Sequence, residues 1–254
     1  MSVIPTNKLL KKHGESPEKL LASCGVNKDE ARSLYTYLKG FGMYSRTTGI
    51  LDTVDELIEK EYWTHLEKIE KKYKKKWRGP NVPIMIFPLD QRREGKMSGV
   101  SFKDKIFLFL TPSVSRKKLE ALFIHEYHHC VRMNKLLKVN KEFTLLDSIV
   151  FEGLAESAVK EYCGEEYIAD WCKKYKQPHL QRMWNTSIKP NLDAKKGERV
   201  HESLLFGKGF APRMMGYAVG YYLIQQWLAD HPASTVKMLS LPSETFILKE
   251  EEKS

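Results

Sequence analysis

The sequence is poor in cysteine and holds no long hydrophobic run. Its 254 residues include four cysteines, and no two of them form a CxxC pair. This sparse use of cysteine does not resemble the disulfide framework of a secreted protein. No apolar stretch approaches the ~20 residues that span a bilayer, and the first residues lack the apolar core of a signal peptide. We therefore expect no transmembrane segment and a location in the reducing cytoplasm.

Acidic residues are in the minority, with 32 Asp and Glu against 42 Lys and Arg, which gives a net charge of +10. A basic surplus favours acidic partners such as a nucleic acid, an anionic membrane surface or an acidic peptide. Five positive charges lie in one run, KKYKKK, at residues 71–76. Because such runs are usually the solvated ends of helices, nucleic-acid binding is an alternative that we do not favour.

Hydrophobic periodicity predicts an α+β fold that is mainly helical, with one small twisted β-sheet. Residues 1–80 are amphipathic, and within residues 49–77 the apolar positions recur every three or four residues, as on one helix that ends near residues 78–80. Short apolar runs then predict a strand in residues 82–90 and one or two strands in residues 99–110, with Lys103, Asp104 and Lys105 as a hairpin tip.

Three further helices are predicted after the sheet, and Ser113 or Ser115 would cap the first of them. Residues 164–208 have no clear period and predict short helices joined by long loops. The helices are expected at about 115–135, 144–162 and 212–229, with a loop near 138–141 and a frayed tail at 249–254.

The stretch HEYHH, residues 125–129, fits the pattern H-E-x-x-H. Each helical residue turns by ~100°, so His125 and His129 lie ~40° apart and can reach one Zn²⁺. Glu126 lies ~80° to one side, where it can take a proton from a water on the metal without being a ligand. His128 lies ~80° to the other side, so packing or hydrogen bonding is its expected role. The alternative for the motif is a pair of buried histidines with ordinary hydrogen bonds.

A catalytic zinc needs a third protein ligand and an open fourth position. The segment LLDSIVFEGLAESAVKEY places Glu152 and Glu156 one turn apart on an otherwise apolar helix. Such carboxylates are costly to bury unless they are paired or bound to a metal, although both would be unremarkable if exposed. Glu152 is the expected third ligand, and Asp147 is a weaker rival that could instead cap the helix. Gly153 would let another backbone come close.

Three segments, HEYHHCVRM, TLLDSIVFEGLAE and PRMMGYAVGYYLI, together resemble the bacterial family of predicted zinc-dependent proteases related to YjaZ, over about residues 80–230. HEYHH with FEGLAE also resembles the glutamate zincins, or gluzincins. The resemblance implies a zinc metallopeptidase, that is, a hydrolase that binds one Zn²⁺ per chain and cleaves a peptide or protein substrate. By this resemblance His125, His129 and Glu152 are the zinc ligands and Glu126 is the general base and acid.

The resemblance further implies that Glu156 hydrogen-bonds a ligand histidine and fixes its tautomer. It implies a zincin-like domain in residues 81–248, in which the sheet at about 82–110 packs on the active-site helix. Residues 1–80 would then form a helical region packed on that core.

A metallopeptidase also needs a donor for the developing oxyanion. Tyr217 and Tyr221 are four residues apart and share a helical face, with Gly216 and Gly220 beside them. The alternative for this face is a packed aromatic stripe. Further candidate donors or substrate contacts in this part of the chain are Arg213, His201 and His179.

Two other functions compete with the peptidase hypothesis. One is a non-catalytic zinc-binding or basic-surface interaction protein on the same scaffold, although structural zinc usually has four ligands. The other is zinc-dependent hydrolysis of a non-peptide amide or ester. By analogy with related proteases, a substrate could pair with an edge strand near Ile106–Leu110 or near Gly99, and the sequence does not show which strand lies at the edge. The sequence does not indicate the oligomeric state either.

Overall fold

The chain is an α+β protein that is mainly helical, and it divides into two compact units, Met1–Cys130 and Val131–Ser254. No helix in the described part of the chain has both the length and the apolar character that crossing a membrane requires. The computed structural model describes residues 2–136, 143–209 and 211–247, so the loop expected near 138–141 and the tail at 249–254 lie outside the described residues.

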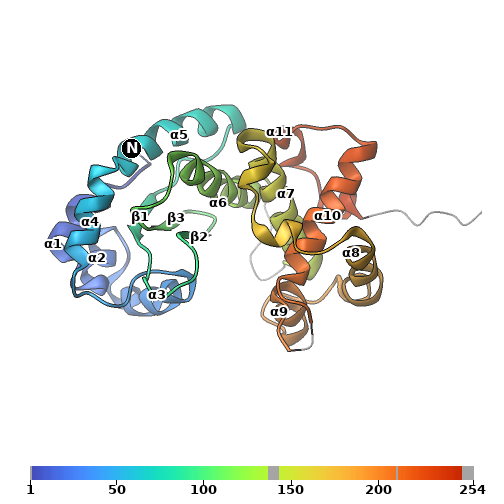
Figure 1. Ribbon diagram of the computed structural model, residues 1–254, viewed down its shortest axis with the longest axis horizontal. Coiled ribbons are helices and arrows are strands. Elements are labelled where there is room, and N and C mark those ends of the chain that lie inside the picture. The colour runs from blue at the N-terminus through green and yellow to red at the C-terminus, as the bar shows by residue number, and fades with distance from the viewer. Residues whose placement is uncertain (1, 137–142, 210, 248–254) are drawn as a thin grey trace, which may run out of the picture. The chain divides into compact units, whose positions relative to one another are not determined.

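The first unit contains a three-stranded sheet with the order β1-β3-β2 (Figure 1). β1 (Ile84–Pro88) and β3 (Ile106–Leu110) are parallel, and all residues of both strands are buried, which explains their unbroken apolar runs. β2 (Met97–Ser101) pairs with β3 in antiparallel fashion and is only partly buried. The predicted strands are confirmed. Because β3 is central, it is not the edge strand expected near Ile106–Leu110, whereas β2 lies at an edge of the sheet.

Five helices precede the sheet, and one prediction about them is wrong. The stripe in residues 49–77 is two helices, α4 (Ile50–Glu59) and α5 (Tyr62–Trp77), because Glu61 between them has a left-handed φ of 56°. Beyond this break Tyr62 is buried, and its hydroxyl donates to the Val114 carbonyl at 2.6 Å. The predicted end near residue 78 is confirmed. The other three helices are α1 (Thr6–His13), α2 (Pro17–Ser23) and α3 (Lys28–Phe41).

Helix α6 (Arg116–Leu136) follows the sheet and carries the HEYHH motif. Ser115 caps it, since its hydroxyl oxygen accepts a backbone N–H of the first turn at 3.2 Å. Tyr127 stacks on Trp77 of α5 and on Phe123, with ring centroids 5.8 and 5.1 Å apart. These stacked rings fix the rotation of α6 about its axis and therefore the direction of the neighbouring motif residues.

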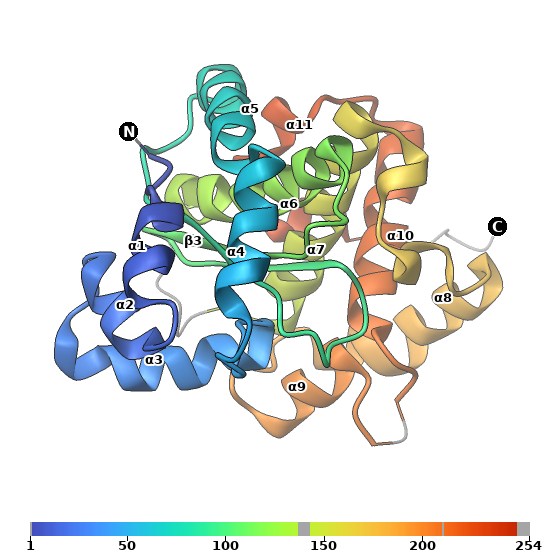
Figure 2. The same cartoon turned by 60° about the vertical axis from the view of Figure 1, so that its left-hand side comes forward.

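The second unit is centred on α7 (Leu145–Cys163) and α10 (Met215–Asp230), which lie side by side in Figures 1 and 2. A Cβ added to Gly220 would lie 1.9 Å from the carbonyl oxygen of Ile149, and one added to Gly153 would lie 2.3 Å from that of Gly220. The close backbone approach expected at Gly153 is therefore present. It holds the helix that carries Glu152 firmly against α10.

Helix α7 begins with a capping box, which explains where the helix starts. The Thr144 hydroxyl oxygen accepts the Asp147 N–H at 3.3 Å, and the Asp147 carboxylate accepts the Thr144 N–H at 3.1 Å. The same carboxylate accepts a hydrogen bond from the Ser243 hydroxyl at 2.6 Å. Of the two roles expected for Asp147, the structure therefore supports the cap.

The stretch between α7 and α10 forms short helices, as predicted. Side chains from these elements share one apolar core with α7 and α10, which includes Ile149, Trp184 and Leu223. The elements between α7 and α10 are α8 (Gln177–Met183), α9 (Arg199–Phe206) and single turns at Glu165–Tyr167, Asp170–Lys173, Trp184–Ile188 and Lys189–Asn191. After α10 follow α11 (Thr235–Met238) and a turn at Ser243–Phe246.

Candidate metal centre

The first and last histidines of HEYHH face each other on α6. Their Nε2 atoms are 3.0 Å apart, and their ring planes are nearly perpendicular at 89°. This arrangement agrees with the ~40° separation expected on a helix. Nitrogen ligands ~2.0–2.1 Å from a tetrahedral zinc ion lie ~3.3 Å apart, so His125 and His129 are spaced closely enough to bind one ion.

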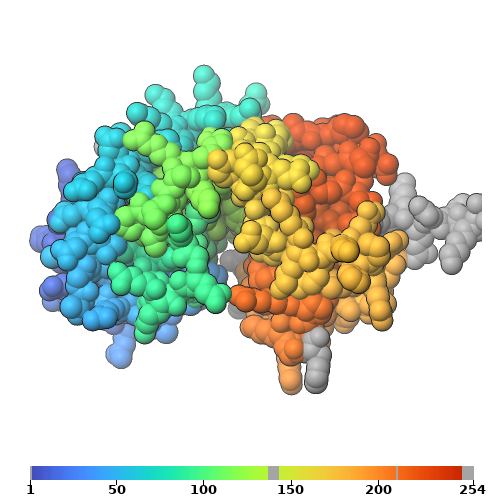
Figure 3. All heavy atoms as spheres, in the orientation of Figure 1, coloured from blue at the N-terminus to red at the C-terminus, as the bar shows by residue number. Residues whose placement is uncertain are grey.

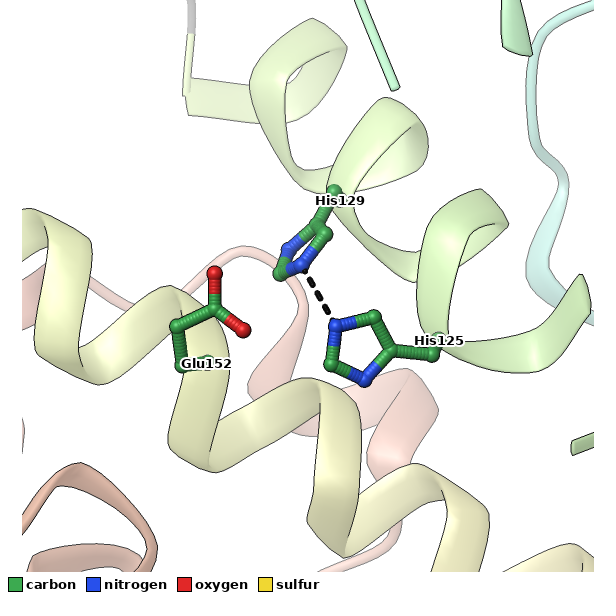
Figure 4. Close-up of side chains that lie close together, drawn as sticks. All are labelled: His125, His129 and Glu152. Carbon is green, nitrogen blue, oxygen red and sulfur yellow. Dashed lines mark hydrogen bonds between the residues drawn. The ribbon is translucent and has the colours of Figure 1, made fainter. Parts of the chain in front are cut away.

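Glu152 on α7 completes a group that could hold a metal ion. One ligand atom from each of His125, His129 and Glu152 lies within 4.8 Å of the others, and all three residues are partly buried. Figure 4 shows the two imidazoles and the carboxylate directed toward one another. Two imidazole nitrogens with one carboxylate oxygen are a set that catalytic zinc sites use, with the fourth position kept for water or substrate. The residues therefore fit zinc.

Glu126 adjoins the histidine pair in the chain but is outside this three-residue group. Its side chain is buried, with 6% exposure, and its Oε2 accepts a hydrogen bond from the Ser101 hydroxyl at 2.5 Å. Ser101 is not among the residues that the sequence motifs predict. No spacing pattern signals this contact, because the two residues are 25 positions apart and lie on a strand and a helix.

His128 is fully buried, with 0% exposure. Its ring meets the edge of Trp77 in a T-shaped arrangement with centroids 6.0 Å apart. This contact agrees with the packing role that the helix geometry predicts.

Arg132, one turn beyond His129, is a second residue that sequence analysis missed. It is fully buried, and its guanidinium donates to the carbonyls of Met238 and Leu239 at 3.2 and 3.3 Å. Burial lowers the pKa of Arg132 to about 10, although Asp147 opposes the shift, so the side chain stays charged at neutral pH. The contacts tie the end of α6 to the segment after α10.

Glu156 is buried one turn after Glu152 on α7. Its Oε2 accepts the Ala169 N–H at 2.7 Å and lies 3.8 Å from the Cys172 sulfur. Burial, reinforced by the Glu156 carboxylate, raises the pKa of the Cys172 thiol, which therefore stays protonated. The hydrogen bond expected between Glu156 and a ligand histidine stays a prediction.

The two candidate tyrosines of α10 differ in their surroundings. The ring of Tyr217 lies between Trp171 and Phe206, with centroids 5.1 and 5.8 Å away, as in a packed aromatic stripe. Tyr221 is 7% exposed, and its hydroxyl has no hydrogen-bond partner among the described residues. Burial raises the pKa of Tyr221, so its hydroxyl keeps the proton that an oxyanion donor needs.

The remaining candidates, Arg213, His179 and His201, differ in their burial. Arg213 and His179 are exposed. His201 is 1% exposed and makes a 2.9 Å hydrogen bond through Nε2 with the Ser148 hydroxyl of α7. Burial lowers the pKa of His201 more strongly than the nearby Glu202 carboxylate raises it, so the imidazole is neutral at pH 7.

The lysine run at 71–76 lies on α5, whose side chains project from the surface in Figure 3 (teal). Lys72 pairs with Glu120 at 2.9 Å and Lys74 with Glu70 at 2.8 Å. This is the solvated helix surface that the sequence predicts. Its ion pairs reduce the positive charge that an anionic partner would meet.

Comparisons with known proteins agree with the resemblance seen in the motifs. A family model described as "Predicted Zn-dependent protease (DUF2268)" matches residues 62–248. "Uncharacterized protein YjaZ" of Bacillus subtilis (strain 168) is 40% identical over 229 residues, which cover 88% of each chain. "Uncharacterized protein YjfC" of the same organism is 29% identical over 153 residues, or 56% of this chain and 50% of the relative. No solved structure matches the chain significantly.

Proposed function

The chain belongs to the family of predicted Zn-dependent proteases, and on this premise we propose that it is a zinc metallopeptidase that hydrolyses peptide bonds. The observation that carries the proposal is the group formed by His125, His129 and Glu152 beside Glu126 in the chain. We propose that these three residues bind one zinc ion per chain and that residues 81–248 form a gluzincin-like catalytic domain. The cytoplasmic location expected from the sparse cysteines stays a prediction.

A zinc ion held by this group would polarise the scissile carbonyl and make an attacking water more acidic. In the proposed reaction Glu126 takes a proton from that water while the water oxygen forms a bond to the carbonyl carbon. Glu126 then delivers the proton to the amide nitrogen as the C–N bond breaks, so a carboxylic acid and an amine leave. The place of Glu126 next to His125 on α6 supports this role, because a residue on the flank of the ligand face can reach a water on the metal without being a ligand.

The developing oxyanion needs a donor, and we propose Tyr217 for this role with Tyr221, Arg213 and His201 as further contacts. The Tyr221 hydroxyl is protonated and has no hydrogen-bond partner within the described part of the chain, which supports a donor role for that residue. His201 would first have to leave its bond to Ser148. We also propose that Glu156 orients a ligand histidine, since it is buried one turn after Glu152.

The proposal is tested by measuring cleavage of a peptide library before and after the metal is removed and then restored. We expect the zinc-loaded protein to cleave peptides, the chelator-treated protein to lose cleavage, and added zinc to restore it. Mass spectrometry of the products would report the cleavage preference in the same experiment. Zinc binding without any cleavage would contradict the peptidase and favour the non-catalytic alternative.

A further inference from the structure

The edge strand β2 touches the proposed general base through two of its residues. The Ser101 hydroxyl donates to Oε2 of Glu126 at 2.5 Å, the distance of a strong hydrogen bond to a carboxylate. Gly99 lies beneath the same side chain: a Cβ added there would come within 2.6 Å of both Cγ and Oε1 of Glu126. Strand β2 therefore forms a seat for this carboxylate.

The pleat of the strand explains why these two positions act together. Side chains alternate between the faces of a strand, so Gly99 and Ser101 share a face, whereas Ser98 and Val100 are on the other. The antiparallel register with β3 fixes both positions, since Gly99 pairs with Leu108 and Ser101 with Ile106. The fully buried β3 thus holds the seat in place.

Gly99 is needed for space and not for backbone conformation. Gly99 does not have a positive φ, so other residues could adopt the same backbone conformation. Any side chain there would collide with the Glu126 carboxyl group. A glycine at this position is therefore explained by the room it leaves for Glu126.

We propose that Ser101 is a positioning residue for Glu126 and that Gly99 provides the space in which the carboxylate is held. The inference rests on the proposed peptidase function and names two residues that serve its base. Because the Ser101 hydroxyl uses one lone pair of Oε2, we assign the proton taken from water to Oε1. Oε1 is then also the atom that releases the proton to the leaving amine.

The kinetic test compares four variants with the zinc-loaded wild type. For Ser101→Ala we expect kcat to fall ~10- to 100-fold with little change in KM, because the substitution misplaces the base and leaves substrate binding unchanged. Ser101→Thr keeps the hydroxyl and should restore kcat to within about threefold of wild type. Gly99→Ala should lower kcat and keep the bound zinc. The matched control Ser98→Ala alters the same strand on the opposite face and should keep the wild-type kcat.

A second readout does not depend on activity. In metal-free protein, a double-mutant cycle of Ser101→Ala and Glu126→Ala measures their coupling in urea unfolding. We expect Ser101→Ala to raise the equilibrium constant of unfolding by about fivefold or more in the wild-type background. In the Glu126→Ala background the same substitution should have little effect. Additive effects would overturn the contact.

The outcomes separate this inference from the proposed function. If wild type cleaves no peptide, the peptidase proposal is wrong. If wild type cleaves and Ser101→Ala has an unchanged kcat, or if Ser101→Thr fails to restore a lowered kcat, the peptidase stands and the positioning role of Ser101 is wrong.

Discussion

His125 and His129 hold their Nε2 atoms 3.0 Å apart, a distance that suits either a hydrogen bond or two ligands of one metal ion. Of two neutral imidazoles at this distance one must donate a proton to the other, whereas a cation between them would use both lone pairs. A carboxylate from Glu152 in the same group adds the negative charge that partly neutralises a divalent ion. At the scale of single residues, the group could therefore hold a metal ion with two imidazole nitrogens and one carboxylate oxygen as ligands.

The role of Glu152 as third ligand is tested by replacing it with Gln. The amide keeps the size of the side chain and loses the charge, so we expect zinc affinity to fall more than ~100-fold, beyond the loss typical of outer-shell partners. Competition with a chromophoric chelator measures the affinity. The control is Glu166→Gln, an exposed carboxylate in the same unit, which should bind zinc like wild type. Equal affinities of the two variants would rule out Glu152 as a ligand.

His201 predicts a pH dependence of stability. Burial lowers its folded-state pKa against the attraction of Glu202 and Glu198 and in the same direction as Lys196. The unfolded chain therefore binds the proton more readily, so stability is complete above the unfolded pKa of ~6.5 and is lost as pH falls below it. We expect His201→Gln, which can still donate to Ser148, to lose less stability than wild type between about pH 7.5 and pH 5.5 in urea unfolding. Identical pH profiles would contradict this account of His201.

At the scale of elements, the contact of α7 with α10 places Glu152. Gly220 meets the backbone of Ile149, and backbone cannot move aside as a side chain can. Gly220→Ala would force the two helices apart, so we expect the free energy of unfolding to fall by about 1–3 kcal/mol or more. The matched control is Gly40→Ala on α3, where nothing lies within 4 Å of an added Cβ. It should leave stability unchanged or raise it by up to about 1 kcal/mol.

Urea unfolding of both glycine variants decides this point. If Gly220→Ala is as stable as Gly40→Ala, α7 and α10 can accommodate the added methyl group, and the prediction is wrong. Zinc affinity measured on the same samples would then show whether separating α7 from α10 also disturbs Glu152.

Most elements could be predicted because their signals are local. The apolar runs of β1 and β3 and the capping residue Ser115 are visible in the sequence, and the structure confirms them. The break at Glu61 could not be predicted because the apolar stripe continues across it. The parallel pairing of β1 with β3 was not predicted either, because short strands carry no signal of their order.

At the scale of the whole molecule, family membership and the metal group point to the same chemistry from different evidence. The family model rests on sequence over residues 62–248, whereas the group rests on three side chains in space. The pairing of His125 with His129 could be predicted because helical geometry relates neighbours along the chain, whereas Glu152 was predicted as an acidic residue on an otherwise apolar helix. Ser101 and Arg132 could not be predicted, because their roles depend on contacts between distant segments that no spacing rule encodes.

The most direct test of the central claim is peptide cleavage by Glu126→Gln beside wild type, with zinc content measured on the same samples. The amide cannot accept the proton of the attacking water, so we predict that kcat/KM falls by ~10²–10⁴-fold while about one zinc per chain is retained. Cleavage by the variant at the wild-type rate would contradict the role of Glu126 and with it the mechanism proposed for this chain.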